Sequence, residues 1–99
     1  MPKQTVRVVA RITARPDSIE PLKAILLGLI GPTRAENGCI SYQLLQNNAD
    51  PTEFTFVEEW ASDTAIHAHF TTPHLRDALA KGTKLFGKDP DIRKYSAIG

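Results

Sequence analysis

The sequence predicts an α+β fold of the ferredoxin-like type, β-α-β-β-α-β, in which an antiparallel sheet carries both helical regions on one face. Three observations predict it. Two segments, residues 5–14 and 53–60, have the two-residue alternation of strands, two regions have the apolar spacing of helices, and turn-forming residues join the second strand to the third. A length of 99 residues suits one domain, residues 1–99.

The first strand is predicted over residues 5–14. Its even-numbered residues are all apolar and its odd-numbered residues are mixed, so we expect one face of the sheet to pack on the core. The apolar set is Val6, Val8, Ala10, Ile12 and Ala14, and the mixed set is Thr5, Arg7, Val9, Arg11 and Thr13.

The first helical region follows Arg15-Pro16, with Asp17 or Ser18 as its cap and Pro21 in its first turn, where a missing N–H is tolerated. We expect Gly31-Pro32 to kink this helix and Asn37-Gly38 to end it in a left-handed conformation. The residues spaced to face the core are Leu22, Ile25, Leu26, Leu29 and Ile30.

Residues 39–46 and 53–60 are the second and third strands, and the turn formers of residues 47–52 predict an antiparallel hairpin between them. The third strand sends alternate side chains to opposite faces. One face carries Phe54, Phe56, Glu58 and Trp60, and the other carries Thr55, Val57 and Glu59. The alternation leaves open which of the two glutamates faces the helices.

The second helical region is predicted in two pieces, before a last strand over residues 91–98. Ser62 caps the first piece, in which Ile66, His69 and Phe70 share one face. Thr72-Pro73 begins the second piece. Its expected core residues are Leu75, Leu79, Leu85 and Phe86, and Gly82 weakens its middle.

Composition narrows the class of protein. The chain is 41% hydrophobic and 23% charged with a net charge of +1, which fits a soluble globular protein and lacks the basic excess of a nucleic-acid-binding one. The longest apolar run, residues 24–30, is too short to span a membrane, and a lone cysteine, Cys39, fits a reducing compartment. We expect a cytoplasmic protein that forms a homodimer through the open sheet face around Val9.

The third strand and the following helix predict a small apolar pocket with titratable groups. His69 is the candidate base, although a histidine beside Ile66 and Phe70 is more often a satisfied core residue. Glu58 would orient it, because a buried carboxylate needs a partner. The candidate substrate contacts are Trp60, Phe56, Phe70, Tyr42 and His74.

Other chemistries find little support in the sequence. His67 and His69 are two residues apart and point in different directions on a helix, so they do not make a paired metal site. The chain has no CxxC, no HExxH, no nucleophile elbow and no glycine-rich phosphate loop. We therefore predict neither a metal nor a cofactor site.

The chain resembles the antibiotic biosynthesis monooxygenase family, which includes small quinol monooxygenases, over nearly its whole length. The resemblance rests on Arg34-Ala35-Glu36-Asn37-Gly38-Cys39 with Tyr42, on Glu58-Glu59-Trp60, and on His69 with Pro73-His74. It implies a dimeric α+β barrel. The haem-degrading branch typically uses an asparagine from the first strand, and residues 1–15 contain none, so that branch is disfavoured.

The resemblance implies a cofactor-independent monooxygenase or oxidase that acts with molecular oxygen on a small hydroquinone-type or polyphenolic substrate. His69 would remove a proton from the substrate, Glu58 would orient the His69 ring, and aromatic side chains would form the walls of the pocket. Two alternatives stay open: an isomerase or lyase on the same scaffold, and a non-enzymatic module that binds a small hydrophobic metabolite.

Overall fold

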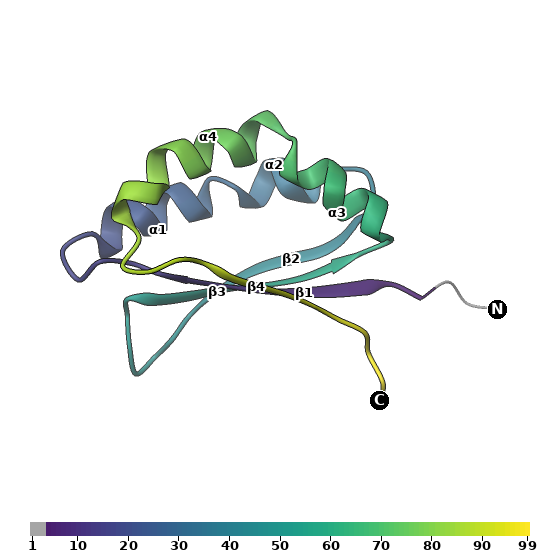
Figure 1. Ribbon diagram of the computed structural model, residues 1–99, viewed down its shortest axis with the longest axis horizontal. Helices are drawn as coiled ribbons and strands as arrows, with labels where there is room; N and C mark the ends of the chain where they lie inside the picture. The colour runs from purple at the N-terminus through teal and green to yellow at the C-terminus, as the bar shows by residue number, and fades with distance from the viewer. Residues whose placement is uncertain (1–3) are drawn as a thin grey trace.

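The structure, a computed structural model, describes residues 4–99 and has two layers, with the helices on one face of a four-stranded antiparallel sheet (Figure 1). The strand order is β2-β3-β1-β4. This confirms the ferredoxin-like prediction. In chain order the elements are β1 (Val6–Thr13), α1 (Ile19–Leu27), α2 (Ile30–Arg34), β2 (Cys39–Gln46), β3 (Glu53–Trp60), α3 (Asp63–Phe70), α4 (Pro73–Gly82), a 3₁₀ turn (Thr83–Leu85) and β4 (Asp91–Tyr95).

The central strand β1 sets the register of the sheet. Val8 lies opposite Glu58 and Ala10 lies opposite Phe56. Paired residues send their side chains to the same face of the sheet, and this face lies under the helices. The even-numbered residues of β1 and β3 are buried there, with the exception of Val6, which is partly buried. The predicted dry and mixed faces are confirmed, and the two edge strands, β2 and β4, pair antiparallel with β3 and β1.

The break in the first helical region lies at Gly28-Leu29, three residues before the predicted position at Gly31-Pro32. Pro32 has no N–H to donate to the Gly28 carbonyl four residues earlier, and its ring crowds that carbonyl. The backbone forms a three-residue hydrogen bond there instead, in which the Leu29 N–H donates to the Leu26 carbonyl at 3.1 Å. The four-residue helical bond returns where the Thr33 N–H donates to the Leu29 carbonyl at 3.0 Å. A proline therefore interrupts this helix one turn upstream of itself.

Two other details differ from prediction at the helix starts. The Ser18 hydroxyl donates to the Asp17 carboxylate at 2.9 Å and does not cap α1. The Thr72 hydroxyl donates to the His69 carbonyl at 2.7 Å, although Thr72 does occupy the position before Pro73 at the start of α4. In contrast, the predicted Ser62 cap is confirmed, because its hydroxyl accepts from the Ala65 N–H at 3.1 Å.

Two boundaries near the C-terminus also differ. Gly82 ends α4 and does not lie in its middle. The last strand stops at Tyr95, which pairs with Arg7, three residues before the predicted end at Ile98, and Ile98 is fully exposed. Within residues 4–99, no helix has both the length and the apolar character needed to cross a membrane.

Candidate active site

A cavity of about 90 Å³ lies between the sheet and the helices. Its walls are aliphatic and aromatic except where Glu58 and His69 reach it, beside the ring of Tyr42. Phe70, Leu79 and Ile92 also line it and are each 40–48% exposed, so the cavity opens to the surface beside them. The predicted burial of Leu79 is wrong for this reason. An apolar hollow that holds two titratable side chains is the typical form of a small-molecule site.

His69 is held among aromatic rings from three elements. It is 3% exposed and lies on the buried face of α3 with Ile66. The centre of its ring is 4.8 Å from that of Trp60 and 5.9 Å from that of Tyr42, and Phe70 packs edge-on at 5.5 Å. These contacts fix the plane of the imidazole.

The acidic partner of His69 is Glu36, a residue that the sequence reasoning did not select. The Nδ1 atom of His69 is 2.7 Å from Oε2 of Glu36, whose side chain is only 11% exposed. The prediction that Glu58 orients His69 is therefore wrong. A carboxylate only accepts, so Nδ1 carries the proton in this bond and Nε2 keeps a lone pair when the ring is neutral.

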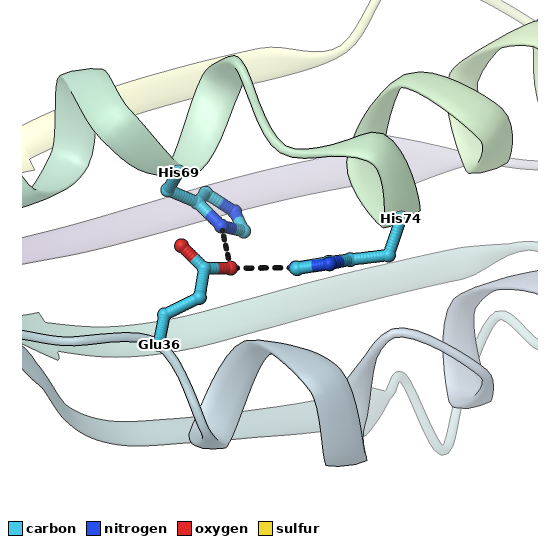
Figure 2. A group of neighbouring side chains, drawn as sticks. All are labelled: Glu36, His69 and His74. Carbon is cyan, nitrogen blue, oxygen red and sulfur yellow. Dashed lines mark hydrogen bonds and ion pairs between the residues drawn. The ribbon is translucent and has the colours of Figure 1, made fainter.

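His74 completes a group of three side chains, which we call the His–Glu–His triad. Its Nε2 atom lies 2.6 Å from the same Oε2 atom of Glu36. Figure 2 shows the three converging from the segment between α2 and β2, from the end of α3 and from the start of α4. The Oε2 atom of Glu36 thus links α3 and α4 to the segment before β2.

A helical pattern in the sequence could have revealed Glu36. Residues 22, 26, 29, 33 and 36 have the alternating four- and three-residue spacing of one helix face. Leu22, Leu26, Leu29 and Thr33 are all buried, so the next residue of that face, Glu36, points inward as well. A charged residue that ends an otherwise buried stripe indicates a polar partner across the interface.

Gly38 fixes the turn that presents Glu36. Its φ of +89° confirms the predicted left-handed conformation, although α2 already ends at Arg34, four residues earlier, so Gly38 does not itself end the helix. The Gly38 carbonyl accepts from the Ala61 N–H at 2.8 Å. A Cβ at this position would lie 2.6 Å from the Ala65 Cβ of α3. Only glycine lets the chain approach α3 this closely, which brings Glu36 within reach of His69.

Glu58 is the strand-three glutamate that faces the helices. It is 6% exposed, and its Oε1 accepts from the Trp60 indole N–H at 2.8 Å. Burial, above all, raises the pKa of Glu58 to about 7, with the charge of Glu36 adding to the rise and the indole bond opposing it. Glu59 lies on the opposite face, where it accepts from the Thr5 hydroxyl at 2.7 Å.

Five of the seven candidate site residues line the cavity: His69, Glu58, Phe56, Phe70 and Tyr42. Tyr42 stacks on Phe56 with ring centres 4.8 Å apart, and its burial together with the charge of Glu58 raises the pKa of its phenol. The other two do not line it. Trp60 is fully buried behind Glu58 and His69, and His74 lies on the far side of Glu36, so both support the site rather than form its wall.

The triad is the one group of three or more metal-ligating side chains found within residues 4–99, and its ligand atoms all lie within 4.8 Å of one another. A tetrahedral zinc ion with bonds of about 2.0–2.1 Å would hold its ligand atoms roughly 3.3 Å apart. The nitrogen–oxygen distances of 2.6 and 2.7 Å are shorter and have the length of charge-assisted hydrogen bonds. The geometry therefore fits a hydrogen-bonded array, and the residues here do not form a prepared metal site.

Comparison with known proteins bears on the identity of this site. A family model described as antibiotic biosynthesis monooxygenase matches residues 5–81. The Mycobacterium tuberculosis protein named "Putative monooxygenase Rv0793" is 44% identical over 76 residues, which cover 77% of this chain and 74% of that protein. Its solved structure aligns with a TM-score of 0.90 at 32% identity, over 96% of both chains.

Two further matches extend the comparison. An uncharacterised protein of Synechocystis is 33% identical over 88 residues, 89% of this chain, and the chain spans only 60% of that relative's length. A crystal structure from Pseudomonas aeruginosa aligns with a TM-score of 0.90 at 30% identity, over 97% of this chain and 96% of that one.

Proposed function

Because the chain belongs to the antibiotic biosynthesis monooxygenase family, we propose that it oxidises a small hydroquinone-type or polyphenolic substrate with molecular oxygen and without a cofactor. One observation carries the proposal. His69 reaches an apolar cavity, while its Nδ1 atom is engaged by a carboxylate outside the cavity wall. This leaves Nε2 as the lone-pair nitrogen available to a hydroxyl in the cavity.

The chemistry needs little from the protein beyond a base and a dry space. When His69 removes a hydroxyl proton, the resulting phenolate donates an electron far more readily than the neutral hydroquinone. Oxygen is itself apolar and is compatible with the aliphatic walls, and exclusion of water protects the reactive intermediates. In the oxidase form, two electrons and two protons pass from the hydroquinone to oxygen, which yields a quinone and hydrogen peroxide. In the monooxygenase form, one oxygen atom enters the ring and the other leaves as water, which yields a hydroxyquinone.

Glu58 has a second role in this proposal. With a pKa of about 7, its carboxyl is protonated in part of the molecules at neutral pH. A protonated carboxyl in an apolar wall can donate a hydrogen bond to a substrate oxygen or to a reduced oxygen species. Glu58 would thus hold the substrate or supply a proton, while Glu36 takes over the orienting role that the sequence assigned to Glu58.

The test is oxygen consumption with a panel of hydroquinones and polyphenols. We expect His69→Ala to lower kcat/KM about 10²–10⁴-fold, the usual contribution of a general base. His67→Ala is the matched control, since His67 lies on the exposed face of the same helix. Incorporation of label from ¹⁸O₂ into the product separates the monooxygenase from the oxidase form.

Other outcomes would point elsewhere. Unchanged turnover in a folded His69→Ala variant would remove His69 as the base. Turnover of a substrate without oxygen would support the isomerase or lyase alternative, and a ligand-induced thermal shift without turnover would support the binding module.

The homodimer is part of the same proposal. The sheet face opposite the helices has no covering layer within the described chain (Figure 1), and it exposes Leu45, Val57 and Tyr95 among charged residues. A second copy with the same face would bury these side chains in a two-fold contact. Sedimentation of the protein as a monomer at micromolar concentration would contradict this arrangement.

A further inference from the structure

The His–Glu–His triad separates two hollows of the molecule. His69 lines the internal cavity, and its side chain is 4% exposed. His74 lines a different hollow, a surface groove of about 240 Å³ between α1 and α4, and its side chain is 24% exposed. Glu36 lines neither and joins the two imidazoles through one oxygen atom. The triad therefore runs from the cavity to the outer surface.

Charge limits how many protons this array holds. Glu36 is 11% exposed, so a net charge on the group is poorly solvated. Two neutral imidazoles would leave the carboxylate uncompensated, and two imidazolium rings would leave an excess positive charge. One imidazolium shared between His69 and His74 makes the triad neutral, and protonation of one ring disfavours protonation of the other.

We propose that the triad is a proton-exchange unit, in which His74 releases a proton to the outer groove whenever His69 takes one from a ligand in the cavity. The inference rests on the proposed function, which supplies the hydroxyl proton. In the resting unit His74 is the imidazolium. When the substrate O–H bond breaks, the proton forms a bond to Nε2 of His69, and the Nδ1–H bond of His74 breaks to give its proton to water. Both rings donate to Oε2 of Glu36 before and after the exchange, so no proton has to cross the carboxylate.

The groups around each imidazole are consistent with a neutral His69 and a charged His74 in the resting unit. His69 faces the carboxyl of Glu58 and the phenol of Tyr42 across the cavity, and neither can supply a positive charge. In the outer groove with His74 are Asp77 and Lys81, which form an ion pair with each other at 3.0 Å. That exposed pair leaves Glu36 as the principal charged partner of His74. His74 is in this proposal a positioning residue, because it does not touch the substrate.

Proton release on ligand binding tests the exchange directly. A hydroquinone that the wild-type protein oxidises is bound without oxygen, and the heat of binding is measured by calorimetry in buffers of different ionisation enthalpy. We expect the wild-type protein to release close to one proton per site. His74→Gln should release close to none, whereas His67→Gln, altered on the exposed face of α3, should behave as the wild type does. Proton release by His74→Gln equal to that of the wild type overturns the proposal.

Kinetics give a second readout that a purely structural role would not produce. We expect His74→Gln to lower kcat roughly tenfold with little change in KM, less than the loss of about 10²–10⁴-fold expected for a general base itself. The acidic limb of its pH–rate profile should move to higher pH, because Glu36 then favours protonation of His69 alone. Added imidazole should restore part of the rate. A His74→Gln enzyme with the wild-type rate and profile contradicts the exchange.

The wild-type protein keeps the proposal testable if the variant does not fold. Nitrogen-15 NMR of the histidine rings should show His69 neutral with its proton on Nδ1 and His74 protonated on both nitrogens. The reverse distribution overturns the proposal, as does tight one-to-one binding of zinc to the triad. If the wild-type protein consumes no oxygen with any hydroquinone, the proposed function fails. If His69→Ala keeps full turnover, His69 is not the base and the exchange unit fails with it; if only His74→Gln does, the base stands and the exchange unit alone fails.

Discussion

Two largely buried carboxylates, Glu36 and Glu58, lie in the region of His69 and have very different partners. Glu36 receives hydrogen bonds from two imidazoles that can carry positive charge. Glu58 receives one bond from the indole of Trp60, a neutral donor that can never carry a proton away. Both side chains are largely removed from water, so burial is common to them and the partner is what differs. The comparison indicates that Glu36 is an anchor and Glu58 a titrating group.

The largest expected effect is the change of the free energy of unfolding with pH that results from the titration of Glu58. Its pKa rises from 4.5 to about 7 on folding, so the folded state binds the proton more tightly than the unfolded state does. The resulting stabilisation is complete below pH 4.5 and is lost as the pH rises through about 7. It amounts to at most roughly 3 kcal/mol, since a tenfold difference in proton affinity corresponds to about 1.36 kcal/mol.

Urea unfolding of the wild type and of Glu58→Gln between pH 5 and 8 measures this effect. The substituted amide would keep an oxygen acceptor for the Trp60 indole but would not titrate, so the wild type should lose stability relative to the variant as the pH rises. Parallel stability curves for the two proteins would mean that burial does not hold the proton on Glu58.

Removal of the anchor is expected to have a somewhat smaller effect on stability. Glu36→Ala leaves the Nδ1–H group of His69 without its acceptor in a position that is 4% exposed, whereas the more exposed His74 can bond to water. A buried donor without a partner costs about 1–3 kcal/mol. The same variant should lose activity with any substrate that needs His69 in its fixed tautomer. A free energy of unfolding within roughly 0.5 kcal/mol of the wild type, the usual range of a surface substitution, would show that the triad does not stabilise the fold.

The smallest expected effect comes from a solvent-exposed carboxylate, which serves as a comparison for the buried Glu36 and Glu58. Asp63 pairs with Lys94 at 2.9 Å, and both side chains are more than half exposed. Exposed ion pairs typically contribute about 0–1 kcal/mol. Lys94→Met should therefore change the free energy of unfolding by no more than this, and a loss comparable to that of Glu36→Ala would mean that a partner matters equally at the surface.

Local patterns were sufficient for most of the fold. The turn formers of residues 47–52 and the alternation over residues 53–60 predicted β2 and β3 with their observed bounds, and Ser62 and Pro73 marked the starts of α3 and α4. These signals are local because a strand or a cap is decided by side chains a few residues apart. The helix breaks at Gly28 and not at the expected Gly31-Pro32, because a proline disrupts the hydrogen bond of the carbonyl four residues before it.

The site could be predicted only in part. The spacing of Ile66, His69 and Phe70 placed the imidazole on an inner face, and the strand pattern placed Phe56 beside it. The strand pattern favours Glu58 as the partner because it shares a face with Phe56 and Trp60, whereas Glu36 lies 33 residues from His69. No local periodicity connects residues at that separation.

The sequence by itself determined which side chains share one face of each element, since alternation and helical spacing follow from the geometry of each separate element. Only the tertiary structure decided which of those buried groups meet. The packing of α3 against the turn at Gly38 pairs Glu36 with His69 and His74 and leaves Glu58 to the Trp60 indole, because a hydrogen bond depends on where two elements lie relative to each other and not on the pattern within either one.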